Sequence, residues 1–317
     1  MLVPVRLPFI HGLLIAAIPL LAMGGFGLAM PPITEAGAEP WCIAGSTAGL
    51  YGILMWLGIV GVTLGLSMLL SMGTADKHAP LVLLVGLATM PWLLGVAGTQ
   101  EAMRQVLVTL PSVGGRDALE VLAAGTGEAM MARLVGAWSS AALLSAVTLG
   151  LLLLYKQARR AGEGAGRLIG AALSLALAVT ALLAAYEAHL LMQMLTPLVA
   201  PASGVHAEQL AILGARLSEV HGLRSALLGM LAVLGLTLVG WQFFPSPRAV
   251  NQWAGSLALV AIAATVLVLD TRPLQLAARG AWKVDASHLL LPSALHDTLA
   301  TALGATRLPA PALRTEP

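Results

Sequence analysis

Seven stretches of this sequence are apolar over a length that can span a lipid bilayer. A membrane-spanning α-helix needs about 20 consecutive, mostly apolar residues, so each stretch predicts one transmembrane helix. Only 10% of the residues are charged, against about 25% in soluble domains. We therefore expect an all-α, polytopic transmembrane helical bundle of about seven helices with a short external C-terminal tail. The predicted spans are 8–30, 48–72, 80–99, 133–155, 168–195, 224–244 and 252–270.

The first apolar stretch has a second interpretation. Arg6 precedes it, as a basic residue precedes the apolar core of a secretory signal peptide. The run is longer than the roughly 7–15 residues of such a core, and no clean cleavage site follows it. We expect a retained helix here, with cleavage as the alternative.

The distribution of basic residues predicts the orientation of the chain, because Lys and Arg are enriched in cytoplasmic loops. Every second connection is basic here. Loop 31–47 has no Lys or Arg, and loops 100–132 and 196–223 balance Arg with Asp and Glu. We expect a cytoplasmic N-terminus and an external tail after Asp270. The residues that set this orientation are Arg6, Lys77, Lys156, Arg159, Arg160, Arg167 and Arg248.

Two of the predicted external loops follow a similar pattern, starting at Leu107 and at Leu195. A Glu-Ala pair precedes each loop, and a Glu and an Arg five residues apart follow it. These residues are Glu101-Ala102, Glu128 and Arg133 in one case, and Glu187-Ala188, Glu219 and Arg224 in the other. We interpret the pattern as repeated hairpins, although Leu/Ala/Gly-rich segments also resemble each other through composition alone. The chain then divides into a first hairpin (1–79), a second (80–160), a third, repeat-like hairpin (161–250), and a seventh helix with the tail (251–317).

Polar residues gather at the outer ends of two predicted spans. Thr99 and Glu101 end one span, and Glu128 and Arg133 lie where the next begins. Five residues on a helix correspond to about 500°, so Glu128 and Arg133 point about 140° apart and do not pair directly. The partners left open for Glu128 are Arg104, Arg133 of a neighbouring subunit, or a solvent cation. The group is either an ion or proton path along a helix interface, or a set of snorkelling charges that mark the membrane boundary.

Glu187 and His189 lie deeper, in the outer third of the 168–195 span. An acidic residue inside an apolar span is costly and often functional. Glu187 is therefore a candidate protonatable site, and His189 titrates near neutral pH. The alternative is that the helix ends earlier and leaves both residues at the interface.

The sequence predicts no enzyme and no cofactor. The single Cys42 excludes an internal disulfide and a Cys-rich metal site. Haem ligation would need His pairs on facing helices, and only His11 and His189 fall within predicted spans, toward opposite membrane faces. The chain has no nucleotide-binding or hydrolase motif in a soluble context. Its net charge of +2 is too small to indicate nucleic acid as a partner.

The stretch from Ala88 to Gly136 places small residues, a threonine and a glutamate at the ends of two predicted apolar segments. The residues of its pattern are Ala88, Thr89, Leu93, Leu94, Gly95, Gly98, Thr99 and Met103 in the first helix, and Gly125, Glu128, Ala129, Met130, Ala132 and Gly136 in the second. The arrangement resembles the MotA/TolQ/ExbB proton-channel family, in which one helix carries a pattern like A-T-x-x-P-L-L-G-L-L-G-T-V-x-G-M. The next helix of that family begins with a pattern like G-I-A-E-A-L-x-A-T-x-x-G. The resemblance covers Leu81 to Arg160.

The resemblance implies a membrane subunit of a proton-motive-force-coupled, stator- or energiser-like complex in a bacterial inner membrane. Family members form an oligomeric ring around a single-helix partner with a periplasmic domain, so other membrane subunits and lipid are the expected partners. Thr99, Glu128 and Thr148 are the first ion-path candidates, and Glu101, Arg133 and Glu187 complete the set.

The sequence also departs from the family pattern. Arg133 occupies the place of a family threonine, the family proline falls one residue away at Pro91, and the cytoplasmic domain between the first two family helices is missing. A fixed cation at Arg133 would repel protons. Two alternatives therefore stay open: a non-conducting structural subunit of a larger membrane complex, and a small-solute or ion transporter built from repeated hairpins.

Overall fold

The computed structural model describes residues 60–61, 79–109, 115–158, 164–199 and 207–241. All of these residues are helical and none forms a strand, which confirms the all-α prediction for this part of the chain. The long helices are α4 (Ala79–Thr109), α5 (Gly115–Ala158), α6 (Gly164–Val199) and α7 (Ala207–Trp241). The predicted spans 8–30 and 252–270, most of 48–72, and the external tail lie outside the described residues.

Two of the helices contain a segment long and apolar enough to cross a membrane. These segments are Ala124–Leu153 in α5 and Gly170–Gln193 in α6. They overlap the predicted spans 133–155 and 168–195. The chain is also helical over the predicted span 80–99 and over most of 224–244, which lie in α4 and α7.

The prediction of loops over 100–132 and 196–223 is wrong for most of their length. α4 continues to Thr109, α5 already begins at Gly115, and α7 begins at Ala207. With 44 residues, α5 is about 66 Å long at 1.5 Å per residue, roughly twice the hydrocarbon thickness of a bilayer. Hydropathy depends on side chains, so it detects only the apolar part of such a helix. The backbone hydrogen bonds of the helix continue through the polar residues on either side.

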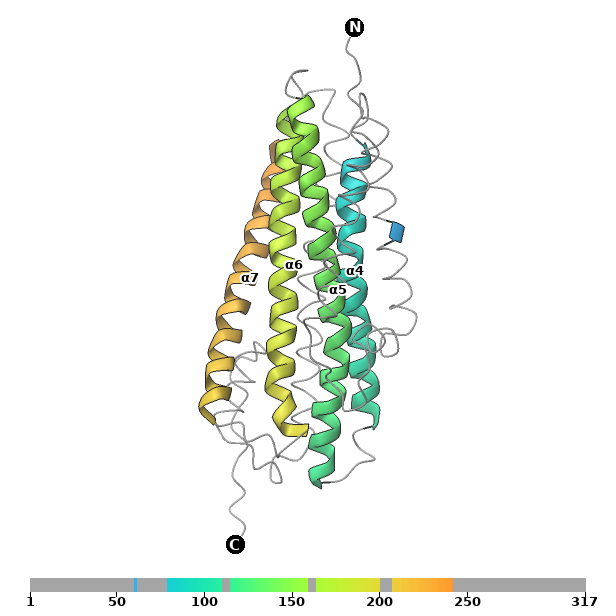
Figure 1. Ribbon diagram of the computed structural model, residues 1–317, viewed down its shortest axis with the longest axis vertical. Helices are drawn as coiled ribbons and strands as arrows, with labels where there is room; N and C mark the ends of the chain where they lie inside the picture. Colours follow the sequence, from blue (N-terminus) through green and yellow to red (C-terminus); the bar gives the residue numbers. More distant parts are fainter. Residues whose placement is uncertain (1–59, 62–78, 110–114, 159–163, 200–206, 242–317) are drawn as a thin grey trace.

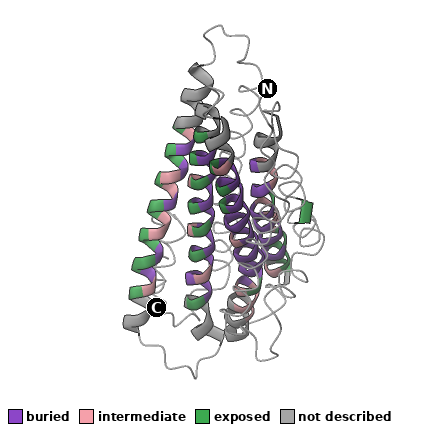
Figure 2. Ribbon diagram, turned by 45° about the horizontal axis from the view of Figure 1, so that its top comes forward, coloured by how far each residue is buried: buried purple, intermediate pink, exposed green. Residues whose placement is uncertain are grey.

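The helices stand side by side in the order α4, α5, α6, α7 (Figure 1). α5 packs closely against both α4 and α6, and α7 packs mainly against α6. Burial is highest in α5 and decreases through α6 to α7 (Figure 2). All residues from Ala129 to Ala137 of α5 are buried, whereas α7 leaves Leu223, Met230 and Val233 exposed. The core of the described bundle is therefore centred on α5 and on the face of α6 that meets it.

The backbones of α4 and α5 touch where two glycines face each other. A Cβ atom added to Gly95 would lie 2.5 Å from the carbonyl oxygen of Ala132 and 3.1 Å from the Cα of Gly136. A Cβ atom on Gly136 would meet the carbonyl oxygen of Pro91 and the Cα of Gly95. Only glycine allows this approach, which is how helices pack closely when small residues line their interface.

The proline inside α4 lies beside this glycine contact. Pro91 cannot donate a backbone hydrogen bond and disturbs the preceding turn. The backbone N–H of the next residue, Trp92, donates to the side-chain Oγ of Ser140 on α5, at 2.9 Å. The neighbouring helix thus supplies an acceptor at the disturbed turn and fixes α4 against α5.

Candidate functional site

Among the described residues, the strongest concentration of buried polar groups lies where α5, α6 and α7 meet. Its centre is Glu187, whose side chain is fully buried within the apolar Gly170–Gln193 segment of α6. Ala184, Ala185 and Ala188 beside it are also buried. Their small side chains leave room for long side chains from the neighbouring helices to reach the carboxylate. The interpretation that the helix ends before Glu187 is wrong, because α6 continues to Val199.

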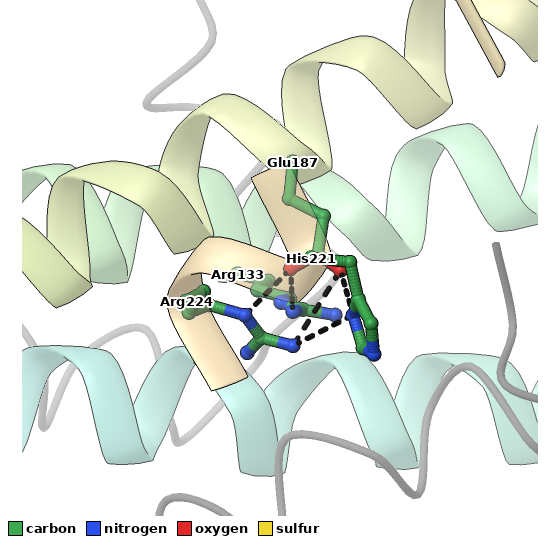
Figure 3. Close-up of polar contacts among 4 residues, drawn as sticks. All are labelled: Arg133, Glu187, His221 and Arg224. Carbon is green, nitrogen blue, oxygen red and sulfur yellow. Dashed lines mark hydrogen bonds and ion pairs between the residues drawn. The ribbon is translucent and has the colours of Figure 1, made fainter. Parts of the chain in front are cut away.

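Two arginines, one from α5 and one from α7, bind this carboxylate (Figure 3). Arg133 of α5 places Nη2 3.0 Å from Oε2 of Glu187, and both side chains are fully buried. Arg224 of α7 places Nε 3.0 Å from the same oxygen, and its own side chain is 2% exposed. Its Nη2 lies 3.5 Å from Oε1. One glutamate on the middle helix therefore links all three helices.

His221 completes the group, which we call the charge cluster: Arg133, Glu187, His221 and Arg224. Its Nδ1 lies 2.8 Å from Oε1 of Glu187 and 3.3 Å from Nη2 of Arg224. A carboxylate oxygen accepts and a guanidinium nitrogen donates, so Nδ1 can hydrogen-bond to only one of them at a time. The shorter contact favours a proton on Nδ1 that is donated to Glu187. The His221 side chain is 27% exposed, so the cluster reaches the surface of the described bundle there.

Such a cluster is stable only when all of its charged groups are present. Charges buried in an apolar environment are tolerated when they are paired and hydrogen-bonded. Removing one partner of a buried ion pair costs about 3–5 kcal/mol, because the other charge is left uncompensated. Glu187 is the only carboxylate among the four residues, so its loss leaves two guanidinium groups facing each other. The cluster thus makes the positions of α5, α6 and α7 interdependent.

Thr99 is one of the predicted site residues, and it lies at a different interface. It is fully buried between α4 and α5. Its Oγ1 lies 2.9 Å from the carbonyl oxygen of Gly95 in its own helix and 2.9 Å from that of Ala129 in α5. A hydroxyl group has one proton to donate, so the two carbonyls share it. Thr99 therefore reinforces the glycine contact between the two helices.

Thr148 lies far from both groups. It is buried between α5 and α6, and its Oγ1 donates to the carbonyl oxygen of Leu144 at 2.8 Å. It also lies 3.0 Å from Oγ of Ser174, whose hydroxyl approaches the same carbonyl at 2.9 Å. Fifteen residues separate Thr148 from Arg133, which is about 22 Å along the axis of α5. The described residues do not bring Thr148 to the charge cluster.

The other two carboxylates of the predicted set are exposed. Glu101 pairs weakly with Arg104 on the same helix, at 3.9 Å, and both side chains are largely exposed. Glu128 is exposed on α5. Arg133, which was one of its suggested partners in a neighbouring subunit, binds Glu187 of its own chain. Interpreting Arg133 as a snorkelling boundary charge is wrong, because its side chain is fully buried.

Sequence reasoning missed two members of the charge cluster. His221 was placed outside any helix, but α7 begins at Ala207 and includes it. Arg224 was noticed only as the repeat counterpart of Arg133. A usable signal was present: His221 and Arg224 are three residues apart and so share one helix face, and a glutamate within an apolar span requires a partner. His189, by contrast, contacts Gln193 at 3.0 Å and lies outside the cluster.

No protein-family model, curated protein or solved structure matches this chain. In the part of the chain that the structure describes, no group of three or more His, Cys, Asp or Glu residues could hold a metal ion.

Proposed function

We propose that this chain is a multi-pass membrane subunit that acts as a structural, non-conducting member of a larger membrane complex. The observation that carries this proposal is the buried ion pair between Arg133 and Glu187 at 3.0 Å. Arg133 stands where the proton-channel family that the α4–α5 hairpin resembles has a threonine. A guanidinium group keeps its proton in proteins, and its fixed positive charge repels an approaching cation.

The arrangement of the other polar groups supports the same proposal. Thr99 and Thr148 bind backbone carbonyls at two separate interfaces, while Glu101 and Glu128 are exposed. A proton path needs polar groups within hydrogen-bonding reach of one another or of intervening water. The charge cluster instead has the properties of a helix-joining element, since it links three helices through one carboxylate.

The experiment measures proton flux and assembly on the same preparation. Purified full-length protein is reconstituted into liposomes, and acidification is followed with an internal dye after a potassium diffusion potential is imposed. We expect flux equal to that of protein-free liposomes, and co-purification of the tagged chain with other membrane subunits from native membranes. Flux above that background which Glu187→Gln abolishes would overturn the non-conducting assignment.

A proton-conducting, energiser-like subunit is the second candidate. The observation that favours it is the contact of the partly exposed His221 with the buried Glu187, which connects an intramembrane carboxylate to the surface of the described bundle. In that case Thr99→Val would also lower the flux. A small-solute transporter would instead show a thermal shift with its substrate in detergent, which neither of the other two predicts.

A further inference from the structure

α7 is attached to the bundle by a narrower contact than the other helices. Among its residues 212–233, for which burial is described, the buried positions are separated by three, seven, four and three residues, so they occupy a single stripe along the helix. They are Gly214, Leu217, Arg224, Leu228 and Leu231. Other residues in this part of α7 are much more open: Leu223 is 55% exposed and Met230 is 68% exposed. Figure 2 shows this contrast with α5, whose described residues are mostly buried.

Arg224 is the largest fully buried side chain on this stripe. Together with His221 it gives α7 its polar contacts with Glu187 (Figure 3). The remaining buried positions within the described part of α7, residues 212–233, are Leu or Gly. Between helices in lipid, such apolar contacts add only packing energy, because lipid tails are as apolar as leucine. The polar contacts with Glu187 therefore fix the position of α7.

The charges show which helix can leave the cluster at least cost. Arg133 and Glu187 form a pair of opposite charge between α5 and α6, and this pair does not need α7. Withdrawal of α7 leaves the pair intact, whereas withdrawal of α5 or α6 separates it.

We infer that α7 is a separable helix, which docks on and leaves the α4–α6 unit as one body, with Glu187 as the docking acceptor. The α4–α6 unit stays together in both states through the Arg133–Glu187 pair and the glycine contact of α4 with α5. This inference rests on the geometry of the charge cluster and holds whether or not the chain conducts protons.

Distance measurements between spin labels test it on the full chain in lipid nanodiscs. Cys42 is the only cysteine, and Cys42→Ser provides the background for labels at exposed positions. Labels at Leu182 and Met230 report on α6 and α7, and labels at Leu149 and Leu182 report on α5 and α6; all three residues are exposed. We expect two populations for the first pair and one for the second. Arg224→Gln should increase the population with the longer α6–α7 distance severalfold and leave the α5–α6 distance unchanged.

Arg224→Lys, which keeps the charge, should increase the longer population less than Arg224→Gln does. A single α6–α7 distance that Arg224→Gln leaves unchanged would overturn the inference. So would equal broadening of both distances, because the bundle would then open as a whole. Should Arg224→Gln fail to accumulate, His221→Leu removes the other α7 contact with Glu187 at a partly exposed position. The α6–α7 and α5–α6 distances, measured on His221→Leu, then test the inference in the same way.

Discussion

The two sides of α5 are held in different ways. Toward α4, contact is made by backbone against backbone at Gly95 and Gly136, with Thr99 bonded to carbonyl oxygens and no buried charge among the described residues of this interface. Toward α6 and α7, contact is centred on Glu187 and its two arginines. The first interface requires glycines, which have no side chain, whereas the second requires all of the charged side chains around Glu187. The resemblance to a proton-channel family lies in the first interface, whereas the buried charge lies in the second.

This difference teaches that a motif and a charged site can be neighbours without forming one path. Arg133 belongs to both regions in sequence, because it lies between Ala132 and Gly136, which face α4. Its side chain nevertheless turns to α6. The α4–α5 hairpin therefore packs through its glycines, while the buried charge on α5 pairs with α6.

The largest effect is expected from Glu187→Ala. It leaves Arg133 and Arg224 buried side by side without their carboxylate, which should destabilise the bundle by about 3–5 kcal/mol. Thermal unfolding in detergent, followed by size-exclusion chromatography, measures the loss. Glu128→Ala is the matched control, because Glu128 is exposed, and it should unfold with the wild-type protein. Equal stability of the two variants would show that the buried charge cluster does not stabilise the bundle.

Next in size is Gly136→Val at the α4–α5 contact. The added side chain meets the carbonyl oxygen of Pro91 and the Cα of Gly95, both of which are backbone atoms that cannot rotate away. Overpacking of this kind costs about 1–3 kcal/mol. The control is Gly127→Ala on the same helix, where an added Cβ has open space. That variant should gain about 1 kcal/mol from helix propensity. Unfolding midpoints measure the effects of both variants. Equal midpoints would contradict the close approach of the α4 and α5 backbones.

Within the charge cluster, the two arginines should differ. Arg133→Met breaks the pair inside the core, while Arg224→Met acts at the peripheral helix and leaves Arg133 with Glu187. We expect the first to cost more, with a difference of about 1–2 kcal/mol within the range for buried pairs. Unfolding of both single variants and the double variant gives the coupling between them. A larger loss of stability for Arg224→Met would contradict the conclusion that α7 is the helix that can leave the cluster at least cost.

The smallest effect is expected from Thr99→Val. It removes the hydroxyl that binds the carbonyls of Gly95 and Ala129 and keeps the shape of the side chain. Hydrogen bonds of this kind between membrane helices contribute about 0.6 kcal/mol on average. Its unfolding midpoint should lie close to that of the wild type and well above that of Gly136→Val. A loss as large as that of Glu187→Ala would show that Thr99 has a role beyond packing.

The helical class and the position of several elements could be predicted, because apolar runs report directly on buried or lipid-facing helices. Glu187 was found by the same logic, as a charge in an apolar run. Its partners could not be found this way, since pairing depends on the order and rotation of helices in space. The ends of α5 and α7 were missed because their outer turns are polar, which placed His221 in a predicted loop. The N-terminal spans and the external tail stay predictions, because they lie outside the described residues.

We propose that the charge cluster joins helices and does not carry protons. The most direct measurement replaces all three fixed charges together, as Arg133→Met, Glu187→Leu and Arg224→Met in one chain. Side chains of similar volume without charge replace buried ion networks with little loss of stability. We predict a folded protein that assembles with its membrane partners at wild-type abundance and keeps the wild-type cellular function. A protein that folds and assembles but loses that function would contradict the account.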